Sequence, residues 1–237
     1  MKHRGKHSND DKNFAPKWHP IFTEAASDLS FLLGKGYGEK SALALVGNRY
    51  QLNKRQQRAL SLITCPSDKL ETRKNKALQA SDLKGKEVVI DGYNLLIVVE
   101  VALSGGYIFI GQDGCCRDIA SIHGTYKKVE ETIPALELID QTLKELQVAK
   151  AHWYFDSPVS NSGRLKTLLY ELATEHQSNW EIDLVFNPDT TLIERNEICI
   201  TGDSWILDEV TTYFNLARYI IEQKIPQATV LNFFQKK

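Results

Sequence analysis

The sequence predicts an α/β fold, in which helices cover both faces of a central parallel β-sheet, preceded by a small all-helical domain. From residue 86 onward, short apolar runs typical of buried strands alternate with longer segments whose apolar residues recur every three or four positions. Before residue 66 only the helical spacing occurs. The sign of the charge also differs between these two parts.

Residues 1–84 contain 16 Lys and Arg against 8 Asp and Glu, whereas residues 85–237 contain 13 against 22. The net charge of -1 conceals this asymmetry. It indicates two modules, one that meets polyanions and one that gathers carboxylates. Two differently solvated surfaces would give the same pattern.

The N-terminal part is divided by composition. Residues 1–13 are polar and basic, and we expect a disordered basic tail. Residues 14–66 are predicted to form a helical basic module, and residues 67–85 a polar linker. Within the module, helices are predicted over 20–33, over 39–46, and from Asn53, a favourable N-cap, to Pro66.

Residues 86–237 are predicted to form the α/β domain. Strands are expected at 86–90, 107–112, 151–155, 181–186, 197–201 and 228–233. Helices are expected at 93–103, 132–149, 161–177, 188–194 and 204–223. Helices of this length connect parallel strands by right-handed crossovers, and ligands then lie beyond the carboxyl ends of the strands.

Aspartates follow four of the predicted strands. Asp91 and Asp156 come directly after theirs, and Asp189 and Asp203 follow within three residues. Asp favours turns and N-caps, but four in equivalent positions favour a functional role. Asp208, five residues after Asp203, is a further candidate.

Carboxylates gathered at one edge repel one another, so they must protonate or bind a cation. Oxygen ligands without histidine select Mg²⁺ or Mn²⁺. Such ions can activate water and stabilise the leaving oxygen in phosphodiester hydrolysis. We therefore expect a metal site at Asp91, Asp156, Asp189, Asp203 and Asp208, with Asp91, Asp156 and Asp203 catalytic.

Several polar residues are candidates for binding the substrate. Small hydroxyl groups and an arginine at a helix start suit a phosphate group, although ordinary helix capping explains them equally well. These candidates are Ser160, Asn161, Ser162 and Arg164, together with Asn94, Arg117 and Asp118 near other strand ends.

Basic residues at the last helix of the N-terminal module predict contact with nucleic-acid phosphates. A solvated basic face is the alternative. The candidates are Arg49, Lys54, Arg55 and Arg58.

Four segments between residue 86 and about residue 220 resemble the PIN/NYN nuclease superfamily: VVIDGYNLL, HWYFD, NPDTTLI and ICITGDSWILD. The segment SALALVGNRYQLNKRQQRAL resembles domain of unknown function 434, which is found joined to a PIN-like domain. The resemblance implies a PIN-like three-layer fold and RNA as substrate. It carries the acids of the family over to Asp91, Asp156, Asp189 and Asp203, with Asp208 as an option.

Two features depart from the family pattern. Residues 104–131 are an insertion relative to a minimal NYN domain, and Asp113 or Asp118 within it could supply a ligand. The helix glutamate of many PIN domains has no clear match. Glu100 lies nine residues after Asp91, about 13 Å along a helix, which is far for the same ion.

The sequence argues against several other classes of protein. No apolar run is long enough to span a bilayer, and the first residues do not resemble a secretion signal. The four cysteines include no CxxC pair, so we expect free thiols and a cytoplasmic location. A homodimer through the predicted helix 204–223 remains open.

The expected function is metal-dependent hydrolysis of phosphodiester bonds, with RNA as the partner. Two alternatives remain: a non-catalytic nucleic-acid-binding protein with a degenerate PIN-like domain, and a hydrolase of small phosphoesters.

Overall fold

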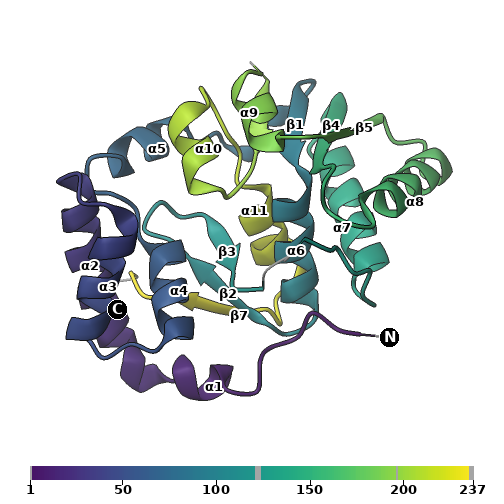
Figure 1. The fold of residues 1–237 in the computed structure, drawn as a ribbon. Helices are drawn as coiled ribbons and strands as arrows, with labels where there is room; N and C mark the ends of the chain where they lie inside the picture. The colour runs from purple at the N-terminus through teal and green to yellow at the C-terminus, as the bar shows by residue number, and fades with distance from the viewer. Residues whose placement is uncertain (1, 121–123, 196, 235–237) are drawn as a thin grey trace.

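The computed structural model describes residues 2–120, 124–195 and 197–234, and it confirms an α/β fold with a parallel central sheet and N-terminal helices (Figure 1). The central sheet has four parallel strands in the order β5-β4-β1-β6. Their bounds are β1 (Glu87–Asp91), β4 (Lys150–Asp156), β5 (Trp180–Val185) and β6 (Ile198–Ile200).

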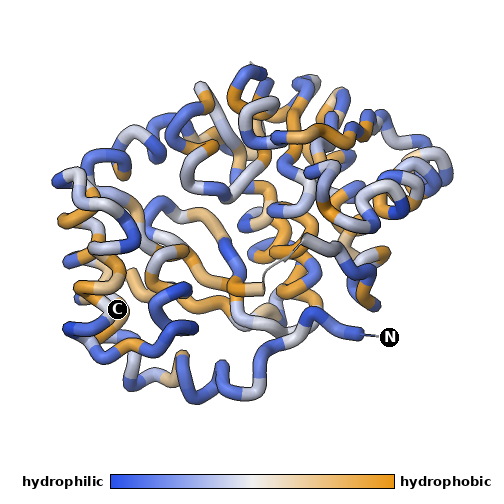
Figure 2. Tube along the Cα trace, in the orientation of Figure 1, coloured by the Kyte–Doolittle hydropathy of each residue, from blue (hydrophilic) through white to orange (hydrophobic). Residues whose placement is uncertain are grey.

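Helices cover both faces of this sheet. Successive side chains of a strand point to opposite faces, and in β1 the apolar side chains on both faces are buried. One face, with Val88 and Ile90, shares a core with α6 (Gly92–Leu103), α7 (Thr132–Glu145), α8 (Ser162–Glu175) and α11 (Leu216–Lys224). The other face, with Val89 and Tyr154, packs against α9 (Pro188–Ile193) and α10 (Ser204–Glu209). Apolar residues concentrate along these central elements (Figure 2).

A second sheet joins the N-terminal helices to the end of the chain. It contains β2 (Tyr107–Ile110), β3 (Cys116–Asp118) and β7 (Thr229–Asn232) in the order β3-β2-β7. The strands predicted at 107–112 and 228–233 therefore exist, but they lie outside the central sheet.

The N-terminal helices share a core with this second sheet. They are α2 (His19–Gly34), α3 (Glu39–Arg49) and α4 (Lys54–Ile63). Phe22 of α2 and Leu60 of α4 lie in one apolar cluster with Phe109 of β2 and Phe233 beyond β7. The helical module is thus packed onto the rest of the molecule and is not a separate unit.

The predicted N-cap of α4 is present. The side chain of Asn53 accepts hydrogen bonds from the backbone N–H groups of Arg55 and Gln56, and the Gln56 side chain accepts from the backbone N–H of Asn53. This reciprocal capping satisfies N–H groups that the helix itself leaves free.

Residues 2–13 differ from the expected disordered tail, because they pack on the body of the molecule. Arg4 Nε donates to Glu100 Oε2 at 2.6 Å, and His3 Nδ1 lies 2.6 Å from Glu131. Glu100 is fully buried, so it needs this cation. The short helix α1 (Asp10–Asn13) follows, and Asp10 is paired with Arg55.

The expected linker at 67–85 is also structured. It contains α5 (Leu70–Lys76) and the 3₁₀ turn η2 (Ala80–Leu83), and a further 3₁₀ turn, η1 (Pro16–Trp18), precedes α2. Arg73 of α5 is buried with 1% of its surface exposed. Its two carboxylate partners, Asp113 and Asp208, lie in other parts of the chain, and neither could be read from the polar composition of the segment.

The long helix predicted at 204–223 is interrupted, and residues between α10 and α11 run beside β6, where Tyr213 bridges Cys199. The apolar side chains of α11 are buried against α6 and α7, so the core accounts for them, and a homodimer stays a prediction. No helix among the described residues is long and apolar enough to cross a membrane. The four cysteines are buried and free.

Candidate metal centre at the carboxyl edge of the sheet

Four aspartates from separate parts of the chain meet at the carboxyl edge of the central sheet. Asp91 ends β1, Asp156 ends β4, Asp189 lies in the first turn of α9, and Asp203 precedes α10. Asp91 is close enough to Asp203 and Asp189 for their charges to raise its pKa, and Asp203 and Asp156 act on Asp189 in the same way. The predicted convergence of these four residues is therefore present.

Asp91 is the most buried of the four, with 9% of its surface exposed. Burial raises the pKa of its carboxyl group from 3.8 to about 7, and the charges of Asp203 and Asp189 act in the same direction. Its neighbour Gly92 is required by packing, since a Cβ there would lie 2.4 Å from the ring of Phe155. The chain can therefore turn directly from β1 into α6 behind this carboxyl group.

Thr201 links the two acids nearest the centre of the sheet. Its hydroxyl donates to Asp91 Oδ2 at 2.9 Å and accepts the backbone N–H of Asp203 at 3.0 Å. Oδ1 of Asp203 accepts the N–H groups of Trp205 and Ile206, whereas Oδ2 has no hydrogen-bond partner among the described residues. Both carboxylates are thereby held in fixed orientations.

Asp156 and Asp189 form the outer part of the group. Burial raises the pKa of each carboxyl group, and for Asp189 the charges of Asp203 and Asp156 add to this effect. Raised pKa values at three of the four acids indicate carboxylates that lack sufficient positive partners. We call Asp91, Asp156, Asp189 and Asp203 the acidic edge.

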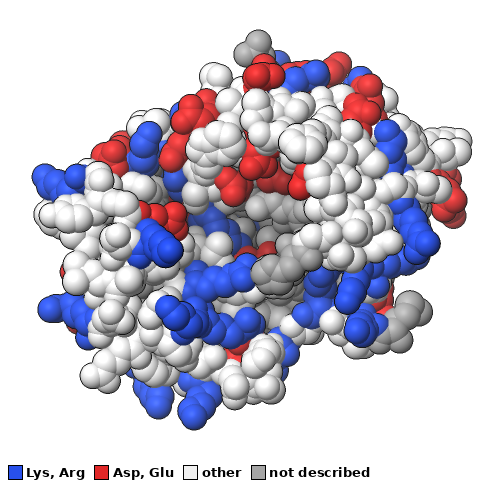
Figure 3. All heavy atoms as spheres, viewed as in Figure 1, with Lys and Arg blue, Asp and Glu red and all other residues white. Residues whose placement is uncertain are grey.

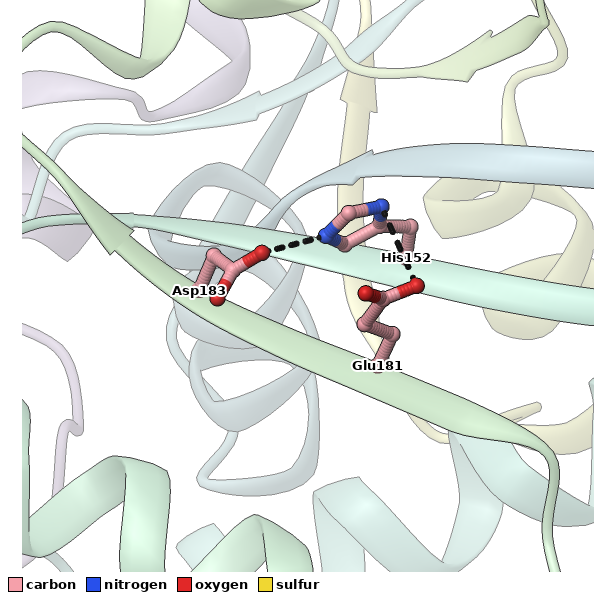
Figure 4. A group of neighbouring side chains, drawn as sticks. All are labelled: His152, Glu181 and Asp183. Carbon is pink, nitrogen blue, oxygen red and sulfur yellow. Dashed lines mark hydrogen bonds and ion pairs between the residues drawn. The ribbon is translucent and has the colours of Figure 1, made fainter.

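A different cluster contains the tightest set of ligand atoms in the described part of the chain. His152 of β4 and Glu181 and Asp183 of β5 have ligand atoms within 4.8 Å of one another (Figure 4). No three residues of the acidic edge reach that spacing. The acidic edge would therefore hold an ion partly through water, as Mg²⁺ commonly is held.

The charges of the His152 cluster are already balanced. His152 Nε2 lies 2.8 Å from Asp183, and Lys150 lies 2.6 Å from Glu181. The hydrogen bond with His152 lowers the pKa of Asp183, and the one with Lys150 lowers that of Glu181. Lowered pKa values are those of satisfied carboxylates. His152 also lies four residues before Asp156, about 13 Å along the strand.

Figure 3 shows acidic side chains on the upper side of a central hollow, with basic side chains on its other side. A cavity of 330 Å³ in this region is lined on one side by Asn94 of α6 and Asp203 before α10. Ser61 and Leu62 of α4 line its other side. Asn94 does not project freely, because its Oδ1 accepts the N–H of Gly202 at 2.9 Å. The N-terminal helices thus form one wall beside the acidic edge.

Arg117 was a candidate for substrate binding, but the structure uses it internally. Its side chain has 5% of its surface exposed and donates to the carbonyl groups of Gly202 and Leu62 and to the carboxylate of Asp113. Burial would raise the pKa of Asp113, but Arg117 and Arg73 outweigh it and lower this pKa to about 2. Asp113 is therefore unsuited to replace a metal ligand.

Asp208 does not join the acidic edge. Its carboxylate accepts from Arg73 Nε at 2.7 Å. Asp118 lines the cavity and has an Oδ1 atom without a hydrogen-bond partner among the described residues, and burial raises its pKa to about 7.

Comparison with known proteins places most of this region in one family. The model of the domain of unknown function DUF5616 matches residues 80–219, more than half of the chain. The chain belongs to the DUF5616 family. The model of the protein of unknown function DUF434 matches residues 21–76, in agreement with the resemblance stated for the N-terminal helices.

A curated relative covers both parts. Uncharacterized protein MJ0935 of Methanocaldococcus jannaschii is 32% identical over 184 residues, which is 78% of this chain and 88% of that protein. No solved structure matches the chain. All four residues of the acidic edge fall within the DUF5616 match.

The loop after Asp156 in the DUF5616 region carries the other substrate candidates. Asn161 adopts a left-handed conformation with φ of 70°, and its amide donates to the carbonyl of Tyr126. Ser162 is buried with its hydroxyl on the carbonyl of Ser157. Ser160 contributes backbone hydrogen bonds to residues 124 and 126. Within the described residues, the exposed side chains of Ser160 and Arg164 have no hydrogen-bond or ion-pair partner.

Of the basic candidates of α3 and α4, two are held by acidic side chains and two are exposed. Arg55 is engaged by Asp10, and Arg49 lies 3.5 Å from Asp28 and over the ring of Tyr50. Lys54 is exposed, and Arg58 is exposed with its charge acting on Asp118. Arg55 is therefore a structural residue, unlike its expected role.

Sequence reasoning missed Thr201 and Arg73. Thr201 could have been noticed, since it directly precedes Gly202 and Asp203 after a strand, where a hydroxyl can bond to neighbouring backbone groups. Arg73 had no such signal, because its partners are distant in sequence. The expected insertion, 104–131, includes residues 121–123, which lie outside the described residues.

Proposed function

We propose that the chain is a metal-dependent nuclease of PIN-like fold that hydrolyses phosphodiester bonds in RNA. The observation that carries this proposal is the acidic edge, in which four carboxylates from β1, β4, α9 and the start of α10 meet with raised pKa values at three of them. Such a group is costly to keep ionised unless a cation binds. The parallel sheet with aspartates at its carboxyl ends supports the PIN-like assignment.

The donor set fits Mg²⁺ or Mn²⁺, because it offers carboxylate oxygens and no nitrogen or sulfur. Asp91, Asp156, Asp189 and Asp203 would hold the ion or ions. When bound, the metal would supply Lewis-acid assistance to the attack of water on phosphorus. Thr201 and the N–H groups at the start of α10 keep the carboxylates of Asp91 and Asp203 aimed into the site.

Two exposed aromatic rings beside the acidic edge support a nucleic-acid substrate. Phe186 has 83% of its surface exposed and lies three residues before Asp189, and Trp205 has 51% exposed and lies two residues after Asp203. Exposed rings stack on unpaired bases in proteins that bind single strands. The preference for RNA follows the PIN/NYN resemblance. The proposed setting is the cytoplasm, with which four free thiols agree.

The test is cleavage of a 5′-labelled RNA that contains single-stranded and hairpin parts, with Mn²⁺ and with excess EDTA. We expect cleavage that EDTA abolishes and that Asp91→Asn or Asp203→Asn lowers at least 100-fold. The matched control is Asp183→Asn, an aspartate of the same sheet in the His152 cluster, which should retain activity. Full activity in Asp91→Asn, or with EDTA present, would overturn the proposal.

The same experiment separates the alternatives. A non-catalytic binder would bind the RNA without metal-dependent cleavage. A hydrolase of small phosphoesters would turn over a chromogenic phosphodiester faster than RNA and with little dependence on salt. Loss of activity in Asp183→Asn but not in Asp91→Asn would indicate that the metal binds at the His152 cluster and not at the acidic edge.

A further inference from the structure

A second cavity, of 540 Å³, lies outside the acidic edge, between α8 and residues 126–128. Its volume is in the range of pockets that bind small ligands. Leu165 and Leu168 of α8 give it an apolar side, and Arg164, Lys127 and Lys128 give it three cationic groups. We call this cavity the α8 pocket.

The three cations of the α8 pocket have no ion-pair partner within the described residues. Several cations elsewhere in the α/β region are instead engaged: Lys144 with Asp140, Lys150 with Glu181, Lys224 with Glu145, and Arg218 with Glu222. Three unpaired cations around one cavity make it a site of positive potential, which favours an anionic ligand. An arginine and lysines together are typical of phosphate binding.

The pocket is polar at its other end. Glu171 lines it and lies seven residues after Arg164, which places both side chains on the same face of α8 about 10 Å apart. A ligand with a phosphate at one end, an apolar ring in the middle and hydroxyl or amino donors at the other end matches this order of groups. In a nucleoside monophosphate the ribose and the flat base follow the phosphate, and the N–H groups at the outer edge of the base form the far end, at approximately that distance.

The wall of the α8 pocket is continuous with the acidic edge. The N–H of Tyr126 donates to the carbonyl of Ser160, and the Asn161 amide donates to the carbonyl of Tyr126. Ser160 and Asn161 belong to the loop that begins at Asp156. The ring of Tyr93, whose pKa is raised by burial and by the charge of Asp156, packs against Tyr126 with ring centres 5.6 Å apart.

We propose that the α8 pocket binds one nucleotide of the RNA strand that reaches the acidic edge. Its phosphate would contact Arg164, Lys127 and Lys128, its ribose and the face of its base would lie against Leu165 and Leu168, and Glu171 would accept a hydrogen bond from an N–H group at the outer edge of the base. The inference rests on the proposed function, because it assigns pocket and acidic edge to one strand. It adds a binding site formed partly by residues 126–128.

The test measures binding without cleavage. A fluorescein-labelled 12-nucleotide single-stranded RNA is titrated with the full chain in EDTA at several salt concentrations, and anisotropy is recorded. We expect the triple variant Lys127→Ala, Lys128→Ala, Arg164→Ala to bind at least 10-fold more weakly. Its slope of log affinity against log salt should be smaller by about 0.7, the value for the loss of one phosphate contact of a single strand.

The matched control removes two equally exposed lysines at the opposite, amino-terminal edge of the sheet, Lys84→Ala with Lys86→Ala. It should bind RNA as the wild type does. Circular dichroism and thermal melting of each variant establish that the chain is folded. Equal affinity of the triple variant and the wild type would overturn the proposal.

Glu171→Ala distinguishes a pocket from a merely positive surface. Removal of a negative charge from a positive surface tightens RNA binding, whereas loss of a hydrogen-bond acceptor in an occupied pocket weakens it. We expect weaker binding. Tighter binding would overturn the assignment of a seated nucleotide.

A further titration identifies the source of the nucleotide. We expect adenosine and uridine monophosphates to compete weakly with the 12-nucleotide RNA for the wild type, and not to bind the triple variant. A monophosphate that binds tightly without displacing RNA would overturn the assignment to the strand and indicate a free nucleotide as the ligand.

Failure of this inference is distinct from failure of the proposed function. If the triple variant binds RNA normally while cleavage still requires Mn²⁺ and Asp91, the pocket assignment fails alone. If RNA occupies the pocket but Mn²⁺ produces no cleavage, the nuclease proposal fails, and with it the assignment of pocket and acidic edge to one cleaved strand.

Discussion

The hydroxyl of Thr201 donates to Oδ2 of Asp91 across 2.9 Å, although 110 residues separate the two in sequence. The same oxygen of Thr201 accepts the N–H of Asp203. One buried hydroxyl therefore fixes the relative positions of two carboxylates that repel each other. This contact favours the ionised form of Asp91 and opposes the effect of burial on its pKa.

Thr201→Val should separate the two acids while it preserves the shape of the side chain. Because the N–H of Asp203 and the carboxylate of Asp91 both lose a partner, we expect a loss of about 1–3 kcal/mol in the free energy of unfolding. We also expect at least a 10-fold weaker affinity for Mn²⁺, measured by titration calorimetry. Thr174→Val, at an exposed position of α8, is the control and should change neither quantity. Unchanged Mn²⁺ affinity in Thr201→Val would contradict a role in positioning.

Asp91→Asn should stabilise the metal-free protein at high pH. The pKa of Asp91 is about 7 in the folded chain, against an ordinary value of 3.8. Between these two pKa values the folded chain keeps the proton of Asp91 and the unfolded chain does not. The free energy of unfolding of the wild type therefore falls as pH rises from about 4 through 7. We expect the melting temperature of Asp91→Asn to exceed that of the wild type by about 3 °C or more at pH 8 in EDTA, and to differ little at pH 4.5. If the melting temperatures of Asp91→Asn and the wild type differed by the same amount at pH 8 and pH 4.5, the pKa of Asp91 would not be raised in the folded chain.

Arg117→Lys should destabilise the fold strongly, because lysine cannot donate simultaneously to Asp113, Leu62 and Gly202. The loss of a partner in a buried ion pair costs about 3–5 kcal/mol. Arg195→Lys, at the partly exposed pair with Glu197, should cost less than about 1 kcal/mol. Urea unfolding monitored by tryptophan fluorescence measures both. A cost for Arg117→Lys no larger than that for Arg195→Lys would remove Arg117 as the link between α4 and the loop before α10.

Phe186→Ala and Trp205→Ala should weaken RNA binding with little effect on stability, since both rings are exposed. Base stacking on an aromatic ring contributes about 1–3 kcal/mol per base, which corresponds to a loss of affinity of about 5-fold to 150-fold for each variant. Phe31→Ala on α2 removes an aromatic ring that is 58% exposed and distant in sequence from the acidic edge, and serves as the control. Anisotropy titration with single-stranded RNA gives the affinities. The same loss in all three variants would argue against specific stacking.

Sequence patterns predicted the local elements well, because the signals were local. The helices α2, α3 and α4, the cap at Asn53 and the strands of the central sheet all follow from spacing and capping within short windows. The convergence of Asp91, Asp156, Asp189 and Asp203 followed from one additional rule, that parallel strands present their carboxyl ends at one edge. Their roles as metal ligands and catalytic residues remain predictions.

Features that depend on distant partners were not predictable. Arg117 and Asp208 are polar residues near strand ends, as binding residues are, and only the tertiary fold shows that Asp113 and Arg73 engage them. The assignment of β2 and β7 to a second sheet also lacked a signal, since an apolar strand has the same pattern in either sheet. The helix predicted at 204–223 was interrupted because residues near Tyr213 pair with β6.

The pairing of β7 with β2 has a consequence for how this chain is made. Phe233 stacks on Phe22 with ring centres 4.7 Å apart, so the interior of the N-terminal helices is completed by residues more than 200 positions later in the chain. A nascent chain on the ribosome can form α2, α3 and α4 early, yet their apolar faces stay open until β7 and Phe233 have been synthesised. Any truncation or fusion that displaces β7 therefore also exposes the apolar faces of α2, α3 and α4.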